Sequence, residues 1–103
     1  MAPVTYSVSK AALECYVRSI SGHLAQRGIR ICGVAPGNIL TEGSVWQKLK
    51  DEEPGRLKDF LASNVDLRRL ANMGEIAEVV AFLASNKASF VTGTVWTADG
   101  GQT

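Results

Sequence analysis

Tyr6 and Lys10 stand four positions apart near the start of the chain. Residues at this spacing share one face of a helix, with Cβ atoms about 5–6 Å apart. A free tyrosine has a pKa of about 10 and is a poor base at neutral pH, but a neighbouring ammonium favours the phenolate. The pair can then exchange a proton with an alcohol or carbonyl oxygen. Taken alone, the same spacing more often marks an ordinary helix start with an exposed lysine.

The segment that carries this pair has a helical pattern from about residue 6 to residue 27. Small and apolar residues recur at steps of three and four, and the pattern places Cys15 on the buried stripe. Gly28 suits a helix end in the left-handed conformation. Residues 29–35 are apolar at nearly every position, which predicts a strand covered on both faces, as in a parallel sheet. Pro36-Gly37 is expected to end that strand.

The rest of the chain is predicted to contain three more helices and a second strand. We predict a helix over residues 41–50, a second short helix that includes Phe60, and a third helix after Asn72 and Glu75. The last two have the spacing of a capping box, with asparagine in place of the usual serine or threonine. A final strand is predicted over residues 94–98.

This order of elements predicts an α/β fold, because two strands joined through helices are expected to be parallel with a right-handed crossover. Two parallel strands make a poor sheet by themselves. We therefore interpret residues 1–103 as a single domain, the C-terminal part of a Rossmann-like doubly wound parallel sheet. About two strands and three to four helices are expected in the chain, and the nucleotide-binding N-terminal half is expected to be missing.

Composition excludes several classes of protein. The hydrophobic fraction of 46% argues against disorder, and a net charge of +1 argues against nucleic-acid binding. No apolar run reaches the roughly 18 residues of a membrane span, and the first residues lack a secretory pattern, so a cytoplasmic location is predicted. His23 has no second ligand at a suitable spacing, so no metal site is expected.

Several segments together resemble the short-chain dehydrogenase/reductase family. Residues 6–12, Tyr-Ser-Val-Ser-Lys-Ala-Ala, resemble its active-site helix. Residues 36–41 resemble the segment beyond the following strand, and residues 88–93 and 99–101 resemble its C-terminal strand and turn. The likeness runs from Tyr6 to the end of the chain and is nearest to bacterial 3-oxoacyl-carrier-protein reductases and related alcohol dehydrogenases.

The resemblance implies hydride transfer between NAD or NADP and a small carbonyl or alcohol substrate. It implies that Tyr6 is the general acid/base and that Lys10 lowers the cost of its ionisation and holds the ribose hydroxyls. The cofactor residues that it implies are Tyr6, Lys10, Pro36, Gly37, Ile39 and Thr41. The residues that it places in a lid over the substrate are Trp46, Leu49, Leu57 and Phe60.

Some family features are not found in the sequence. There is no glycine-rich loop to receive the pyrophosphate at a helix N-terminus, and no region corresponding to the upstream catalytic serine. Met73-Gly74 stands where the family often has Pro-Glu. The chain alone is therefore expected to be inactive. The family also implies a homo-oligomer, a dimer or a tetramer, and the alternative function is a non-catalytic fragment that acts as a self-associating interaction module.

Other interpretations stay open for individual residues. Thr41 could simply cap the next helix, and Trp46 could pack the lid against the body of the protein rather than line a pocket. Trp96 is expected in the core or in a subunit interface. Arg68 and Arg69 are expected on a solvated face, with pairing to the acidic residues 51–53 as a weaker possibility.

Overall fold

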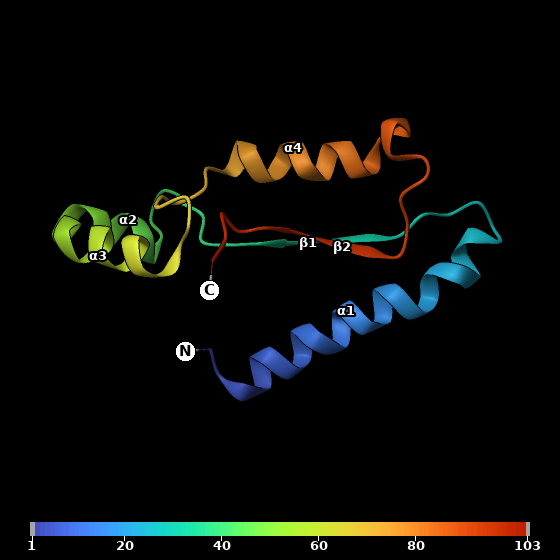
Figure 1. The fold of residues 1–103 in the computed structure, drawn as a ribbon, viewed down its shortest axis with the longest axis horizontal. Helices are drawn as coiled ribbons and strands as arrows, with labels where there is room; N and C mark the ends of the chain where they lie inside the picture. Colours follow the sequence, from blue (N-terminus) through green and yellow to red (C-terminus); the bar gives the residue numbers. More distant parts are fainter. Residues whose placement is uncertain (1, 103) are drawn as a thin grey trace. The chain divides into compact units, whose positions relative to one another are not determined.

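A computed structural model describes residues 2–102 and shows a small sheet with helices (Figure 1). Its elements, in chain order, are α1 (Val4–Ala25), β1 (Cys32–Pro36), α2 (Val45–Glu52), α3 (Pro54–Asn64), α4 (Met73–Ala84), a short 3-10 helix (Asn86–Ala88) and β2 (Thr94–Ala98). Four α-helices and two strands in the described residues confirm the predicted α/β composition.

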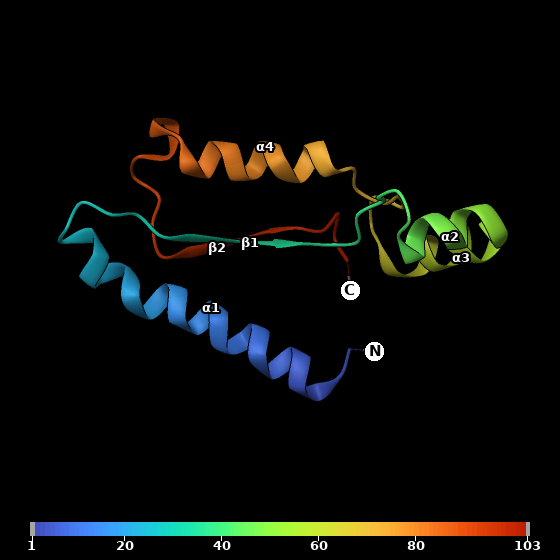
Figure 2. The same cartoon turned by 180° about the vertical axis from the view of Figure 1, so that it is seen from behind.

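The two strands pair directly and run parallel, as predicted. They lie side by side in both views of the ribbon (Figures 1 and 2). At one end the Gly93 amide donates to the Ile31 carbonyl at 2.7 Å, and at the other the Gly37 amide donates to the Ala98 carbonyl at 3.1 Å. From the first bond to the second, the residue number rises on both strands, from 31 to 37 and from 93 to 98. The two strands therefore run in the same direction.

β1 is shorter at its start than the sequence pattern predicted. The Ile29 amide donates to the Leu24 carbonyl at 3.0 Å, which ties residue 29 to the end of α1 rather than to the sheet. Pro36, expected to end the strand, is its last residue. The strand is half-buried over Cys32–Ala35 instead of being fully covered on both faces.

Close contacts divide the chain into two compact units, which are described separately. The first unit contains residues 2–34 and 82–96, and the second contains residues 35–81 and 97–102. Both strands and α4 pass from one unit into the other.

In the first unit, α1 buries a single residue, Val17. Cys15 is exposed, so its predicted place in a buried stripe is wrong: the stripe contributes little to the packing of this unit. α1 approaches the start of β2 closely at Gly93, where a Cβ atom would lie 2.9 Å from Ser21 Cβ. Because Gly93 also has a φ of +69°, only glycine is comfortable there.

Arg30 links the end of α4 to the loop that precedes β2. Its guanidinium donates to the carbonyls of Leu83 at 2.8 Å, Ser85 at 3.1 Å and Val91 at 3.2 Å. The last carbonyls of a helix lack partners within the helix, so a cation placed there satisfies them and complements the helix dipole. This half-buried arginine is a structural residue that the sequence analysis did not single out.

Trp96 is not a core residue, which corrects one of the two predicted placements. Its side chain is 37% exposed and stacks on Phe82, with ring centroids 5.7 Å apart and planes at 29°. The second predicted placement, in a subunit interface, stays a prediction.

The second unit has its own apolar cluster. Leu57, Leu61 and Val65 are buried, and Trp46, Leu49, Phe60 and Leu70 pack around them. α2 and α3 contact each other and lie side by side in both views (Figures 1 and 2). Pro54 occupies the first turn of α3, where its missing N–H costs nothing. The hairpin formed by α2 and α3, with the residues that follow it, therefore has a small apolar core of its own.

The predicted capping box at the start of α4 is confirmed. The Glu75 amide donates to Asn72 Oδ1 at 3.0 Å, and the Asn72 amide donates to Glu75 Oε2 at 2.9 Å. Each side chain thus satisfies a backbone donor that the helix leaves without a partner.

The predicted pairing of Arg68 or Arg69 with residues 51–53 is wrong. Arg69 pairs with Glu75, which is closer along the chain, and Glu53, the residue before α3, pairs with Arg56 at 3.4 Å. Arg69 and Glu53 each have an oppositely charged partner a few residues away, and the two do not pair with each other.

Within residues 2–102, no helix has the length and hydropathy needed to cross a lipid bilayer.

Candidate functional site

The predicted acid/base pair lies in the first turns of α1. Lys10 Nζ is 5.5 Å from the centroid of the Tyr6 ring, so the ammonium lies over the aromatic face. Tyr6 is 56% exposed. The helical spacing therefore brings the two side chains together as predicted, on an exposed surface of the helix.

The start of α1 fixes where Tyr6 lies on the helix. Pro3 precedes the helix with φ −57° and ψ 145°, and the Ser7 amide donates to the Pro3 carbonyl at 3.1 Å. Proline pre-sets this backbone angle, which favours a defined first turn. Ser9 Oγ donates back to the Thr5 carbonyl at 2.7 Å, so its hydroxyl is engaged by the helix itself.

Pro36 and Gly37 stand at the carboxyl end of β1, where open α/β sheets bind their ligands. The Gly37 amide completes the ladder with the Ala98 carbonyl. A Cβ atom at Gly37 would lie 2.7 Å from Asp99 Cα, so the two backbones touch at a distance that only glycine allows. The close contact holds the start of the loop in place.

Ile39 and the residues beside it are held by the segment before α4. Ile39 forms a parallel bridge with Ala71; the Ala71 amide donates to the Asn38 carbonyl at 3.0 Å and the Leu40 amide donates to the Ala71 carbonyl at 2.8 Å. Backbone bonds on both sides of Ile39 keep this part of the loop in one position.

Thr41 does not cap the next helix, which corrects the alternative interpretation of this residue. α2 begins at Val45, later than predicted, and its cap is Ser44, whose Oγ accepts from the Gln47 amide at 3.1 Å. Gly43, with a φ of +73°, makes the intervening turn. Thr41 contributes its carbonyl to that turn by accepting from the Ser44 amide at 3.1 Å.

The predicted cofactor residues are divided between the two units. Tyr6 and Lys10 belong to the first, and residues 36–41 belong to the second.

Three of the four predicted lid residues, Trp46, Leu49 and Phe60, line a groove of about 370 Å³ on the α2–α3 hairpin. The Trp46 and Phe60 rings are 5.2 Å apart with planes at 34°. Leu57 is different: it is buried in the hairpin core and does not line the groove. The remaining lining residues are Val45, Lys48, Glu52, Glu53 and Arg56.

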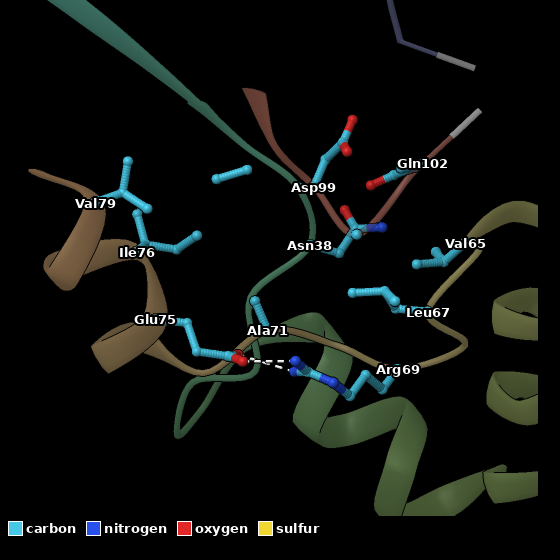
Figure 3. A pocket seen from close by; sticks show the side chains of 13 residues that line it. Asn38, Val65, Leu67, Arg69, Ala71, Glu75, Ile76, Val79, Asp99 and Gln102 are labelled. Atoms are coloured by element: carbon cyan, nitrogen blue, oxygen red, sulfur yellow. Dashed lines mark hydrogen bonds and ion pairs between the residues drawn. The ribbon is translucent and has the colours of Figure 1, made fainter. Parts of the chain in front are cut away.

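The sequence analysis missed a second cavity, of about 200 Å³, beside the first turns of α4 (Figure 3). It is lined by Gly37, Asn38, Val65, Leu67, Arg69, Ala71, Glu75, Ile76, Val79, Ala98, Asp99, Gly100 and Gln102. Asn38 Nδ2 is buried and has no hydrogen-bond partner within residues 2–102. No local sequence signal could have indicated this cavity, because its lining comes from three separate segments, within residues 37–38, 65–79 and 98–102.

Arg69 and Glu75 form a two-point ion pair at the wall of this cavity (Figure 3). Arg69 donates from Nη1 to Oε2 at 2.9 Å and from Nη2 to Oε1 at 2.6 Å. The hydrogen bond from Arg69, helped by that from the Asn72 amide, lowers the pKa of Glu75 from 4.5 to about 2. The same pairing raises the pKa of Arg69.

Among the described residues, no group of three or more His, Cys, Asp or Glu side chains is placed to hold a metal ion.

Comparison with known proteins was made for the whole sequence. The profile of the family described as Enoyl-(Acyl carrier protein) reductase matches residues 2–103. Isoepoxydon dehydrogenase patN of Aspergillus clavatus is 39% identical over 99 residues, which are 96% of this chain and 38% of that protein. Oxidoreductase UcpA of Salmonella typhimurium is 37% identical over 100 residues, which are 95% of this chain and 38% of that protein.

Solved structures show the same likeness. A crystal structure of a putative betaketoacyl-ACP reductase matches with a TM-score of 0.73 and 40% identity, over 93% of this chain and 38% of the other. L-Sorbose reductase from Gluconobacter frateurii, solved with NADPH and L-sorbose, matches with a TM-score of 0.81 and 27% identity, over 94% of this chain and 39% of the other.

The fold places the chain in the α/β class with a Rossmann-like sheet, and the similar proteins are named as dehydrogenases, reductases and oxidoreductases. Within that class, the chain belongs to the short-chain dehydrogenase/reductase family. The chain spans about 38% of the length of the curated relatives that it matches.

Proposed function

We propose that this chain is part of an oxidoreductase that moves a hydride between NAD or NADP and a small carbonyl or alcohol substrate. The observation that carries the proposal is the placement of Lys10 Nζ over Tyr6, 5.5 Å from the ring centroid, at the exposed start of α1. In this function Tyr6 gives its proton to the carbonyl oxygen during reduction and takes one from the alcohol during oxidation.

Lys10 has two roles in the proposal. The first is electrostatic, because the ammonium lies over the Tyr6 ring and puts a positive charge beside the group that transfers the proton. The ammonium also offers three N–H donors, which suit the hydroxyl oxygens of a ribose. Both roles require an exposed lysine on the same helix face as the tyrosine, which the structure provides.

The residues at the carboxyl end of β1 suit one end of a nicotinamide cofactor. Gly37 permits a close backbone approach there, and the bonds on both sides of Ile39 hold the loop rigid. We assign Pro36, Gly37, Ile39 and Thr41 to the carboxamide and ring of the nicotinamide. When it is bound, the reduced nicotinamide supplies the hydride.

The α2–α3 hairpin is proposed to cover the substrate. Its groove presents Trp46, Leu49 and Phe60, which suit an apolar part of the substrate. Leu57 supports that surface from the core of the hairpin instead of touching the substrate. The structure of L-sorbose reductase with a bound ketose supports a carbonyl substrate for a relative of this fold.

The chain by itself is proposed to lack turnover, because its sequence contains no glycine-rich loop for the pyrophosphate. A chimera supplies that part: residues 2–102 replace the matched segment of L-sorbose reductase. We expect the folded chimera to oxidise NADPH only when a ketone is present and to form the alcohol. A chimera that is folded and binds NADPH, yet reduces no member of a panel of ketones that includes L-sorbose, would contradict the proposal.

The second candidate, a self-associating interaction module, is favoured by a specific observation. Val4, Val8, Leu13 and Tyr16 of α1 are between 55% and 78% exposed. Exposed apolar groups of this kind favour association. The two functions separate in one experiment on the 103-residue chain: sedimentation in the presence and absence of NADPH. A stable dimer or tetramer that ignores the cofactor supports the module, whereas a monomer contradicts it.

A further inference from the structure

We propose that Glu75 is a positioning residue for the loop of residues 38–40, which it holds through the segment between α3 and α4. All of these residues lie in the second compact unit. Ile39 of this loop is one of the residues assigned to the nicotinamide, so the consequence for catalysis rests on the proposed function. The structural link does not, because it consists of hydrogen bonds among residues 38–75.

The loop is anchored to Ala71, two residues before α4. The Ala71 amide donates to the Asn38 carbonyl at 3.0 Å, and the Leu40 amide donates to the Ala71 carbonyl at 2.8 Å. Ile39, between them, forms the parallel bridge with Ala71. Two bonds to one residue fix both the distance and the direction of the loop. The loop therefore keeps its position only as far as Ala71 keeps its own.

The Glu75 carboxylate is bonded on both sides of Ala71. On one side, its Oε2 accepts from the Asn72 amide at 2.9 Å. On the other side, Oε2 accepts from Arg69 Nη1 at 2.9 Å and Oε1 accepts from Nη2 at 2.6 Å (Figure 3). Because Glu75 lies in the first turn of α4, these bonds tie residues 69 and 72 to the helix and hold Ala71 between two fixed points.

Arg69 extends this hold to the backbone. Its Nη1 also donates to the Leu70 carbonyl at 3.3 Å, directly before Ala71. A planar guanidinium binds a carboxylate through two parallel bonds, which fix a direction as well as a distance. Exposed ion pairs usually add little to stability, and two-point pairs within a network are the exception. The pair is therefore suited to setting the position of residues 69–72.

Helix capping alone does not account for Glu75. The reciprocal bonds with Asn72 complete the capping box and satisfy backbone donors at the start of α4. A glutamine at this position would serve the same cap, because its side-chain oxygen accepts from the same amide. Only a carboxylate presents two acceptor oxygens, and Glu75 uses them to engage both nitrogens of Arg69. The charge of Glu75 thus serves the segment before the helix.

The link is tested first on the full 103-residue chain, by hydrogen exchange of single amides. Glu75→Ala removes the whole carboxylate. We expect the protection of the Leu40 and Ala71 amides to fall about tenfold in this variant, the usual effect of losing a helix cap. Glu75→Gln keeps an acceptor for the Asn72 amide and is expected to cause part of that loss.

Two controls separate the link from overall stability. Glu78→Ala removes an exposed carboxylate from the same helix and is expected to leave both of those amides protected. The Gln47 amide, which donates to Ser44 Oγ at 3.1 Å, reports on the neighbouring cap of α2. It should keep its protection in Glu75→Ala.

The consequence for catalysis is measured in the chimera, as the rate of hydride transfer in a single turnover at saturating NADPH. We expect Glu75→Ala to lower this rate about tenfold, because a small displacement of bound reactants slows the step between them. Binding of 2′-phospho-ADP-ribose, which lacks the nicotinamide, is expected to stay unchanged in the same variant. A general loss of folded protein would weaken every ligand alike, so the two measurements separate positioning from stability.

Three results would overturn the proposal. The first is unchanged protection of the Leu40 and Ala71 amides in Glu75→Ala. The second is an equal fall at the Gln47 amide, which would show a loss of overall stability. The third is an unchanged rate of hydride transfer in the Glu75→Ala chimera. A native chimera without turnover would contradict the proposed function instead, and amide exchange in the chain would still decide the link.

Discussion

The two compact units of the chain differ in how many apolar side chains they bury. The first unit carries Tyr6 and Lys10 on a helix that buries only Val17. The second closes around Leu57, Leu61 and Val65, and it caps the start of α4 with two side chains. The groups that would do the chemistry thus lie on the open surface, and the groups that would position ligands lie on the better-packed part.

In the proposed function, the two units have different roles. A proton-transfer group has to reach its substrate, so exposure at Tyr6 is compatible with function. A loop that positions a cofactor has to stay in place, and residues 36–41 are fixed by backbone bonds and by the Gly37 contact. Rigid support of a binding site improves the geometry of the reacting groups.

The largest expected effect on stability concerns the core of the second unit. Leu61→Ala is expected to destabilise the chain by about 2–5 kcal/mol, because it leaves a cavity in the buried cluster. The control, Leu13→Ala, truncates the same side chain on α1, where it is 55% exposed, and its effect should stay near zero. Urea unfolding measures both. Equal losses of unfolding free energy in the two variants would contradict the difference in packing between the units.

The next effect concerns the backbone contact at the loop. Gly37→Ala places a Cβ atom 2.7 Å from Asp99 Cα, so backbone has to move and stability should fall by more than about 1 kcal/mol. Gly55→Ala, at a position in α3 with nothing within 4 Å of the new atom, is the control and is expected to be neutral or stabilising. Thermal unfolding of both variants sharpens the contrast; a neutral Gly37→Ala would show that the loop is not held there.

The smallest effect on stability concerns pH. The folded state lowers the pKa of Glu75 from 4.5 to about 2, so its contribution is complete above about pH 4.5 and is lost as the pH falls toward 2. As the pH falls, the unfolded chain binds this proton at a higher pH than the folded chain does. Protonation of Glu75 therefore favours unfolding. We expect Glu75→Gln to flatten that part of the stability profile, whereas Glu78→Gln on the same helix should leave it unchanged. Identical profiles for the native chain and Glu75→Gln would contradict this.

Local patterns in the sequence predicted much of this structure. The strand over residues 94–98 and the capping box of Asn72 and Glu75 depend on short-range signals, and both are confirmed. The Tyr6–Lys10 geometry follows from helix periodicity in the same way. These features need only neighbours in sequence, so a single chain specifies them.

Features that depend on packing could not be predicted in this way. Periodicity placed Cys15 in a core, but burial requires a partner element, and Cys15 is exposed. Thr41 and Ser44 are both possible caps by residue type, and only the turn at Gly43 selects Ser44. The cavity beside Asn38 is lined by residues from 37 to 102, a set that no local pattern brings together.

The most direct test of the central claim compares two tyrosines on one helix. Tyr6→Phe and Tyr16→Phe in the chimera remove the same hydroxyl from two residues of similar exposure, 56% and 55%. We predict that Tyr6→Phe lowers the turnover of ketone about a thousand-fold with little change in NADPH affinity, and that Tyr16→Phe keeps near-normal turnover. Near-normal turnover of the Tyr6→Phe chimera would contradict the assignment of Tyr6 as the proton donor.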